Sequence, residues 1–172
     1  MDVSIREVQE SDVDDIQELN MASWLEAYDG IIPEEKMRSN INYPVDRLRK
    51  KKNDDKLIFL VAEVENKVVG TINFCWSENN THEFVKTEEN QAQLRSVYLH
   101  PDYWGNGIGT KLFKNGLKKL PDEITELKVE SLKDNDVGRN FYSKLGFEKV
   151  EKSQVELFGD KYQTIIRTKI LT

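Results

Sequence analysis

Three alternating glycines, Gly105, Gly107 and Gly109, stand between a strand-like run and a helix-like run of the sequence. Glycine tolerates positive φ and has no side chain, so an anion can approach the backbone N–H groups closely. The helix that begins here adds unsatisfied N–H donors and the positive end of its dipole. The stretch therefore predicts a phosphate-binding loop. A turn without a ligand is the alternative, but unused glycines cost stability.

Two other kinds of phosphate loop fit this stretch less well. A Walker loop needs lysine and then serine or threonine after its last glycine, whereas "GIGTKL" has threonine before lysine. A dinucleotide fingerprint needs G-x-G-x-x-G after the first strand of a βαβ unit, whereas the spacing here is G-x-G-x-G after an antiparallel hairpin. Glu130, about twenty residues downstream, keeps a NAD-binding enzyme open as a minority alternative.

Two separate segments carry a resemblance to a known family. Residues 98–112, "YLHPDYWGNGIGTKL", resemble the acetyl-CoA loop of the GNAT superfamily of N-acetyltransferases, and "NDVGRNFYSKLGF" resembles the downstream helix of that family. Gly107 and Gly109 match the family glycines, whereas Trp104 stands where arginine or glutamine is usual. The resemblance is sharp from about residue 93 to 147, and two motifs in the family order are more specific than either alone.

The resemblance implies acetyl-CoA as the co-substrate and no metal. The Val97 N–H would donate to the acetyl oxygen, Asn135 would bind the pantetheine arm, and Tyr142 would protonate the departing sulfur. Asn135 and Tyr142 are about two helical turns apart, so they share nearly one helix face. The cofactor-binding set implied in this way is Val97, Tyr98, Leu99, Trp104, Gly105, Asn106, Gly107, Ile108, Gly109, Thr110, Lys111, Asn135 and Tyr142.

The general base is less well defined by the sequence. Many relatives place a glutamate on the strand before the glycine loop, but the corresponding stretch offers Gln91 and Gln93, which cannot accept a proton at neutral pH. A base from elsewhere or a chain of waters is therefore required. Glu26 and Asp29 at the end of the first helix, and His100 beside the loop, are the candidates, and each could equally be a surface side chain.

The acceptor would be an amine. Trp24 and Tyr28 lie in "SWLEAYDGIIPEEKM", which resembles the segment W-x-x-A-Y-x-G-x-x-P of many bacterial and archaeal GNAT members. Aromatic faces with nearby carboxylates suit an ammonium group, although both rings could instead be core anchors of an amphipathic helix. We expect acetyl transfer to a primary amine of a small molecule such as a polyamine. A protein amino group, or an acyl-CoA sensor without turnover, remains an alternative.

Composition limits the cellular context. A formal net charge of −6 over 172 residues disfavours nucleic acid as a partner and leaves a cationic small molecule possible. The polar N-terminus and the lack of a long apolar run argue against a signal peptide and a membrane span. Cys75 lies in an apolar run and has no second cysteine, so it is expected to be a core thiol in a cytoplasmic protein. The resemblance implies a monomer or a homodimer.

Hydrophobic periodicity outlines the elements that position these residues. Alternation predicts a first strand over 2–8, and helical spacing predicts a helix over 11–28 that Ser11 or Asp12 caps. The pattern then predicts a short helix after Pro33, a short helix within 41–56 that ends in a solvated basic run, and a hairpin about "ENK". After a polar stretch over 78–90 it predicts a strand ending at Pro101, a helix over 108–120 that Pro121 closes, a strand over 124–132, a helix closed by Gly146 and a final hairpin about "FGDK".

This order of elements predicts the fold class. Hairpins followed by alternating strands and helices give a mixed sheet with helices on its faces, in an α/β or α+β domain. The resemblance narrows this to a single GNAT-like domain over 1–172, with about seven strands, a splayed parallel pair and about four helices.

Overall fold

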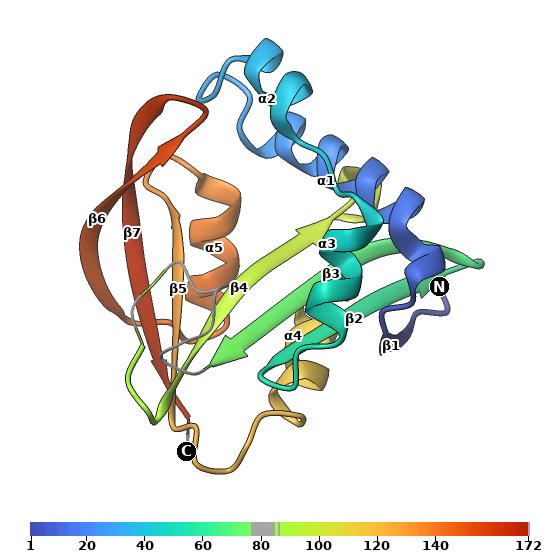
Figure 1. Cartoon of the computed structure of the whole chain (residues 1–172). Helices are drawn as coiled ribbons and strands as arrows, with labels where there is room; N and C mark the ends of the chain where they lie inside the picture. Colours follow the sequence, from blue (N-terminus) through green and yellow to red (C-terminus); the bar gives the residue numbers. More distant parts are fainter. Residues whose placement is uncertain (77–84, 86, 172) are drawn as a thin grey trace. The chain divides into compact units, whose positions relative to one another are not determined.

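Strands and helices follow one another in the order that the sequence predicts (Figure 1). The computed structural model describes residues 1–76, 85 and 87–171, so most of the polar stretch 78–90 lies outside the described residues. In chain order the elements are β1 (Ser4–Glu7), the 3-10 turn η1 (Glu10–Asp12), α1 (Val13–Ala27), α2 (Glu34–Asn40), α3 (Val45–Lys52), β2 (Leu57–Val64), β3 (Lys67–Trp76), β4 (Gln91–Leu99), the 3-10 turn η2 (Pro101–Tyr103), α4 (Ile108–Leu117), β5 (Glu126–Leu132), α5 (Asp136–Lys144), β6 (Lys149–Leu157) and β7 (Asp160–Ile170).

The strands form a mixed sheet in the order β1-β2-β3-β4-β5-β7-β6. β4 and β5 are parallel, and their register runs from Gln91 opposite Glu126 to Gln93 opposite Lys128, at the start of both strands. The mixed seven-stranded sheet with one parallel pair confirms the predicted α/β fold class. The described residues form five α-helices where the resemblance implies about four, and the two short helices that periodicity predicts after Pro33 and within 41–56 both form, with Pro33 and Pro44 at their N-caps.

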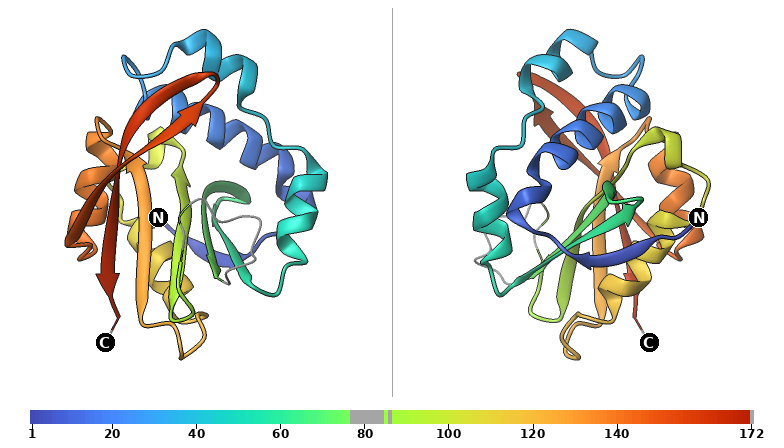
Figure 2. Two further views of the ribbon diagram at one scale, coloured as in Figure 1. Left: turned by 60° about the vertical axis from the view of Figure 1, so that its left-hand side comes forward. Right: turned by 90° about the vertical axis from the view of Figure 1, so that its right-hand side faces the viewer.

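The chain groups into two compact units, residues 1–74 with 96–120 and residues 75–95 with 121–172. The single domain over 1–172 stays a prediction. In the first unit, α1 and α4 lie on opposite sides of the strands β2 and β3 (Figure 2). α1 is fixed to β3 by the Asp15 carboxylate, whose Oδ2 accepts the Val68 N–H at 3.0 Å. α4 approaches β3 so closely that a Cβ on Gly116 would lie 2.2 Å from the Phe74 ring.

A charged network joins β1, η1 and β2 in the first unit. The Arg6 guanidinium donates to both carboxylate oxygens of Asp12 at 2.9 Å and to Glu63 Oε2 at 2.7 Å. Asp12 also accepts the Gln9 N–H, so its carboxylate makes no cap hydrogen bond to α1. Asp12 is thus the N-cap residue by position, but the prediction that its side chain caps the helix is wrong because Arg6 and Gln9 occupy that carboxylate.

The second unit is built on three antiparallel strands. β7 pairs with β5 along Leu132–Glu126 and with β6 along Leu157–Lys149. The β6–β7 turn has positive φ at Phe158 and Gly159, and α5 stops at Gly146 with φ 91°, so the predicted hairpin and helix stop are both confirmed. Figure 1 shows α5 lying along β5 and β7.

Two predictions about individual side chains have different outcomes. Cys75 is fully buried and takes part in no disulfide, which confirms the core thiol. The basic run of α3 is not wholly solvated, because Lys51 is only 4% exposed and its Nζ lies 5.5 Å from the centre of the Tyr43 ring. The lysine stem packs against aromatic faces, which accommodate its charge by a cation–π interaction.

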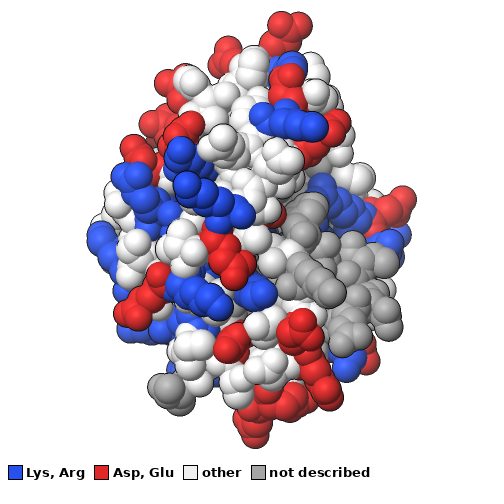
Figure 3. All heavy atoms as spheres, turned by 90° about the vertical axis from the view of Figure 1, so that its left-hand side faces the viewer, with Lys and Arg blue, Asp and Glu red and all other residues white. Residues whose placement is uncertain are grey.

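The surface shows no single-sign field on the face that Figure 3 presents. Lys and Arg side chains are interspersed there with Asp and Glu among the described residues. None of the described helices has the length and apolarity that a membrane span requires.

Candidate active site

The glycine loop of the first unit ends in the N-terminus of α4. Gly105 and Gly107 have φ of 79° and 77°, which L side chains rarely adopt. Gly107 is the N-cap of α4 and makes no side-chain cap, and the first intrahelical bond is from the Lys111 N–H to the Gly107 carbonyl at 3.0 Å. The preceding N–H groups of the first turn have no intrahelical acceptor, and the turn contains no acidic residue. The loop therefore offers donors and a positive dipole end to an anion.

Side chains within the loop hold it in this shape. The Trp104 indole N–H donates to the Leu99 carbonyl at 2.7 Å, which ties the loop to the end of β4. The Asn106 side-chain amide donates to the carbonyls of Tyr103 and Trp104, both at 3.1 Å. Trp104, at the position where the resemblance implies arginine or glutamine, thus contributes a hydrogen bond within the loop.

The end of β4 carries the other residues predicted in this unit. Val97, Tyr98 and Leu99 are half-buried. Just before them, the Ser96 hydroxyl accepts a hydrogen bond at 3.1 Å from the amide of Asn73, a residue that is 3% exposed. The strand ends where the His100 N–H donates to the Val69 carbonyl at 2.8 Å.

Aromatic side chains of α1 meet the same strand. The ring centres of Trp24 and Tyr28 are 4.7 Å apart in an edge contact, and Trp24 lies 6.4 Å from Tyr98. The structure therefore brings the two predicted acceptor residues together with Tyr98, which the sequence assigns to the cofactor.

A pocket of about 390 Å³ opens at the turn from α1 to α2, which directly follows Tyr28. The Tyr28 carbonyl shapes the turn by accepting the N–H groups of Ile31 at 2.9 Å and Ile32 at 3.0 Å. The pocket is lined by Leu25, Asp29, Gly30, Ile31, Ile32, Pro33, Glu34 and Met37. Apolar walls with the two carboxylates suit an alkyl chain that bears positive charge.

The side chains considered for the general base differ in their surroundings. Glu26 is exposed and does not line the pocket, whereas Asp29 does. His100 Nδ1 accepts the Asp102 N–H at 3.2 Å, so its imidazole is held by its own turn. None of these contacts tests a role in proton transfer, and all three assignments stay predictions.

The two glutamines at the start of β4 are structural in the second unit. Gln91 donates to Glu126 Oε2 at 2.6 Å and accepts the Glu88 N–H at 2.9 Å, which fixes the start of the parallel pair. Gln93 is 1% exposed and lies 3.8 Å from the Cys75 sulfur.

α5 positions the two functional residues predicted in the second unit. Asn135 is the N-cap of α5, and its Oδ1 accepts the Gly138 N–H at 3.0 Å. A Cβ on Gly138 would lie 2.7 Å from the Asn135 amide and 3.5 Å from the Tyr142 ring. Asn135 and Tyr142 therefore share one side of the helix, as their spacing predicts. Both are 8% exposed, and Tyr142 packs edge-on against Phe147 with ring centres 5.7 Å apart.

Sequence reasoning missed Arg167 in this unit. It lies within the run "TIIRTKI" of β7 and is 6% exposed, with its Nη1 donating to the Ser131 hydroxyl at 2.9 Å. A single arginine inside an apolar strand run was the available signal, because arginine is rarely buried without a specific partner.

Comparison with known proteins identifies the family. Residues 14–147 match the acetyltransferase (GNAT) family. The chain belongs to this family. It is 31% identical over 159 residues to a spermidine N(1)-acetyltransferase of Thermoplasma acidophilum, covering 88% of this chain and 91% of that protein. The family confirms the resemblance found in the sequence and makes the chain an acetyltransferase.

Solved structures of GNAT proteins share the fold. The PaiA N-acetyltransferase of Thermoplasma acidophilum, in complex with coenzyme A, superimposes with a TM-score of 0.76 and 25% identity over 99% of both chains. A probable acetyltransferase of Staphylococcus epidermidis superimposes with a TM-score of 0.74 at 17% identity, over 99% of this chain and 100% of that one. The coenzyme A complex supports the use of acetyl-CoA by this GNAT chain.

Proposed function

We propose that this GNAT enzyme transfers the acetyl group of acetyl-CoA to a primary amine of a small polycation, with spermidine as the representative acceptor. The observation that carries the proposal is the glycine loop, because it presents N–H donors at the N-terminus of α4 in a turn without acidic residues. The same chemistry is expected for the diphosphate of acetyl-CoA. The spermidine acetyltransferase with 31% identity supports the choice of acceptor.

The residues present fit the cofactor. Gly105 and Gly107 leave open space where side chains would stand, so a diphosphate could approach their backbone. In the proposal, the loop residues from Trp104 to Lys111 hold the diphosphate, and Val97 and Leu99 hold the pantetheine and the acetyl group through their backbones. Asn135 binds the pantetheine arm from the start of α5. Acetyl-CoA supplies the thioester that is cleaved.

The reaction proceeds by direct attack in a ternary complex. The neutral amine nitrogen attacks the thioester carbon, and the Val97 N–H stabilises the negative charge that develops on the carbonyl oxygen. The C–S bond breaks, and Tyr142 donates its phenolic proton to the sulfur. The proton lost by the amine passes to Glu26, Asp29, His100 or a chain of waters, and solvent reprotonates Tyr142.

The pocket at the turn from α1 to α2 is the proposed acceptor site. Asp29 and Glu34 attract the distal ammonium groups of a polyamine, and the apolar walls accommodate the methylene chain, while Trp24 and Tyr28 offer aromatic faces at the end of α1 that precedes the pocket turn. We expect Asp29→Asn and Glu34→Gln each to raise the KM for spermidine by about three- to tenfold. Glu35→Gln is the matched control, because Glu35 is exposed and does not line the pocket.

The first experiment measures binding and turnover in the same sample. Tryptophan fluorescence is titrated with acetyl-CoA and, separately, with NAD, and free thiol is then assayed after spermidine is added. The fluorescence of Trp104 should change when the glycine loop binds acetyl-CoA. Saturable quenching by acetyl-CoA with thiol release supports the transferase. Binding without release over a panel of amines would favour an acyl-CoA sensor, and release only with protein acceptors would replace the small amine.

A further inference from the structure

Arg167 is a buried cation that the reaction described above does not use. Its hydrogen bond to the Ser131 hydroxyl at 2.9 Å is a bond to a neutral group. Within the part of the chain that the structure describes, no carboxylate lies within ion-pair distance of Arg167. A buried charge without a counter-ion is costly, so a function is expected of it.

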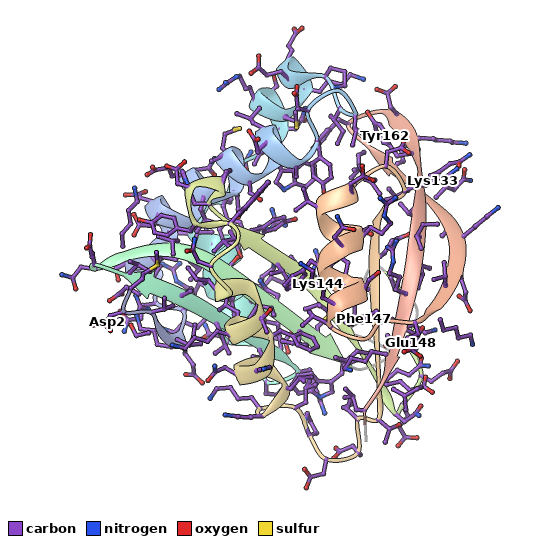
Figure 4. The ribbon with its side chains drawn as sticks, turned by 180° about the vertical axis from the view of Figure 1, so that it is seen from behind. Asp2, Lys133, Lys144, Phe147, Glu148 and Tyr162 are labelled. Atoms are coloured by element: carbon purple, nitrogen blue, oxygen red, sulfur yellow. The ribbon has the colours of Figure 1, made fainter. Side chains whose placement is uncertain are left out.

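The sheet register places Arg167 on the side of β7 that α5 covers. Arg167 lies opposite Val129, so it projects from the same face as Val129 and Ser131. Lys169, two residues further along β7, projects from this face too, and its Nζ would lie 2.8 Å from a Cβ on Gly146. The C-terminal end of α5 therefore lies over this face, and Figure 4 shows Lys144 and Phe147 at that end.

Helix and strand geometry bring Tyr142 over Arg167. α5 connects β5 to β6, and both of these strands are antiparallel to β7, so α5 runs in the direction of β7. Tyr142 lies in the last turn of α5, which ends at Lys144 shortly before Gly146, and Arg167 precedes Lys169 by two residues, about 7 Å along the strand. Gly146 and Lys169 lie close together, and the two elements run in the same direction. Tyr142, which precedes Gly146, and Arg167, which precedes Lys169, therefore lie at neighbouring levels of the two elements.

The two groups interact electrostatically. Burial lowers the pKa of the Arg167 guanidinium from its ordinary value, Tyr142 acts in the opposite direction, and the nearby Arg139 charge lowers the pKa further. An ionised Tyr142 favours the charged form of Arg167, and by reciprocity the charged Arg167 favours ionised Tyr142. Arginine remains protonated at neutral pH, so this field is always present.

The other charged groups on this face do not oppose the effect. Arg139 of α5 is paired with Asp136 at 3.0 Å, and Lys169 lies at the end of the helix. Lys152 of β6 shares the face, because it lies opposite Ile165, and is exposed to solvent. Two anions belong to the same face, Glu156 of β6, which lies opposite Lys161, and Glu148, which precedes Val150 by two residues, and both are exposed to solvent, which screens their charge.

A tyrosine needs such help to act as an acid toward a thiolate. An ordinary phenol has a pKa of about 10, whereas an ordinary alkyl thiol has a pKa of about 8.5, so proton transfer from phenol to thiolate is uphill. We propose that Arg167 is a positioning residue of the acetyl transfer, whose buried charge stabilises the tyrosinate form of Tyr142 and so lets Tyr142 protonate the departing thiolate. This inference rests on the proposed function, in which Tyr142 is the general acid.

The step balances without a further reactant. As the C–S bond of the tetrahedral intermediate breaks, its electron pair goes to sulfur, and the sulfur takes the proton from the Tyr142 oxygen. The tyrosinate is held by the Arg167 charge until solvent returns a proton, while the amide nitrogen releases its own proton to the base. Arg167 keeps its protons throughout and acts only through its charge.

Titration of the phenol tests the coupling without any turnover. Tyrosinate absorbance near 295 nm is followed from about pH 7 to 12, and the signal of Tyr142 is obtained by subtracting the Tyr142→Phe protein. We expect Arg167→Met to raise the midpoint of Tyr142 by about one pH unit or more relative to the parent, because the buried phenol loses the charge that favours its ionised form. Arg167→Lys keeps the charge and should leave the midpoint close to that of the parent.

Controls separate charge from folding. Lys128→Met removes a cation from β5, but Lys128 projects from the opposite face of the strand to Val129, so the midpoint of Tyr142 should not move. Thermal unfolding of each variant shows whether it is folded. If Arg167→Met does not fold, the midpoint of Tyr142 is compared between Ser131→Ala and the parent instead. Ser131→Ala removes the hydrogen bond that holds the Arg167 guanidinium in position.

Kinetics then link the coupling to catalysis. At pH 7.5 we expect Arg167→Met to lower kcat about tenfold with an unchanged KM for acetyl-CoA, and Arg167→Lys to recover most of it. An unchanged Tyr142 midpoint in Arg167→Met would overturn the inference even if the parent acetylates spermidine. If the parent acetylates no amine, the proposed function fails, while a shifted midpoint would still establish the interaction between Arg167 and Tyr142.

Discussion

At the scale of single residues, Trp104 explains how the glycine loop keeps its shape. Its indole N–H donates to the Leu99 carbonyl at 2.7 Å, and Asn106 closes the loop with bonds to two carbonyls. A loop fixed in this way loses little conformational entropy when it binds an anion. In the proposed function, the Trp104 side chain would therefore raise cofactor affinity through preorganisation of the loop.

Replacement of Trp104 tests this role. We expect Trp104→Phe to weaken acetyl-CoA binding about three- to tenfold, because one hydrogen bond is worth about 0.5–1.5 kcal/mol, and to leave kcat at saturating acetyl-CoA nearly unchanged. Isothermal titration calorimetry measures the affinity, since the fluorescent reporter is lost. Trp76 at the end of β3 provides the matched Trp→Phe control. An equal loss in Trp76→Phe would show that the effect is not specific to the loop.

Asp12 carries the clearest pH dependence of a single residue. Burial opposes its ionisation, but the Arg6 guanidinium and the Gln9 N–H hold the pKa of Asp12 below its ordinary value. A group whose pKa is lower in the folded chain adds stability above its unfolded pKa of about 3.9 and loses it as the pH falls toward the folded value.

The corresponding prediction compares Asp12→Asn with the parent across pH. Above about pH 5 we expect the variant to be less stable by about 1–3 kcal/mol, because the buried ion pair is broken and Arg6 keeps only Glu63. The difference should shrink as the pH falls below about 4. Urea unfolding at several pH values measures it. A difference independent of pH would mean that the carboxylate charge is not what Arg6 stabilises.

At the scale of elements, close packing decides the position of α4. A Cβ on Gly116 would lie 2.2 Å and 2.9 Å from two ring atoms of Phe74, far inside van der Waals contact. Alanine in a helix interior ordinarily stabilises by about 1 kcal/mol relative to glycine. Here we expect Gly116→Ala to destabilise by about 1–3 kcal/mol, because the ring must move within a packed core.

Rescue of the Gly116 variant checks the cause. The double variant Gly116→Ala with Phe74→Leu removes the ring that the new methyl group meets, so it should be more stable than the sum of the two single changes predicts. Thermal unfolding of the four proteins gives the coupling. Strict additivity would show that the helix position does not depend on this contact.

The elements that the sequence predicts well are those whose signals are local. The hairpin turn at Asn66, the stop of α5 at Gly146 and the cap at Asn135 all follow from residue types that favour particular backbone angles. The resemblance located the glycine loop and α5 for the same reason, because both motifs are contiguous in sequence.

The features that the sequence does not predict depend on contacts between distant segments. Arg6 binds the Asp12 carboxylate, which therefore does not cap α1. Arg167 lies next to α5 only because β7 pairs with β5. Lys51 is buried by aromatic rings from outside its helix, Tyr43 and Phe59. Such pairings are set by the tertiary fold, whereas local periodicity records only whether a position tends to face the core.

At the scale of the whole molecule, the relevant property is the net charge of −6 with a pI near 5.1. Acidic and basic side chains are mixed over the face seen in Figure 3, so this face has no patch of one sign. The net negative charge therefore attracts cations as a diffuse field. A polyamine cation approaching such a molecule is attracted over distances comparable to the Debye length, which is about 10 Å at 0.1 M salt.

The proposed acceptor therefore predicts a characteristic salt dependence. We expect the KM for spermidine to rise about three- to tenfold between 20 and 300 mM NaCl, because screening removes both the diffuse attraction and part of the attraction by Asp29 and Glu34. A monoamine of similar length carries less charge, so its KM should rise less, and kcat for both amines should change little. Initial rates with saturating acetyl-CoA measure these constants. Equal salt dependence for the two amines would contradict recognition by charge and favour recognition by the apolar walls of the pocket.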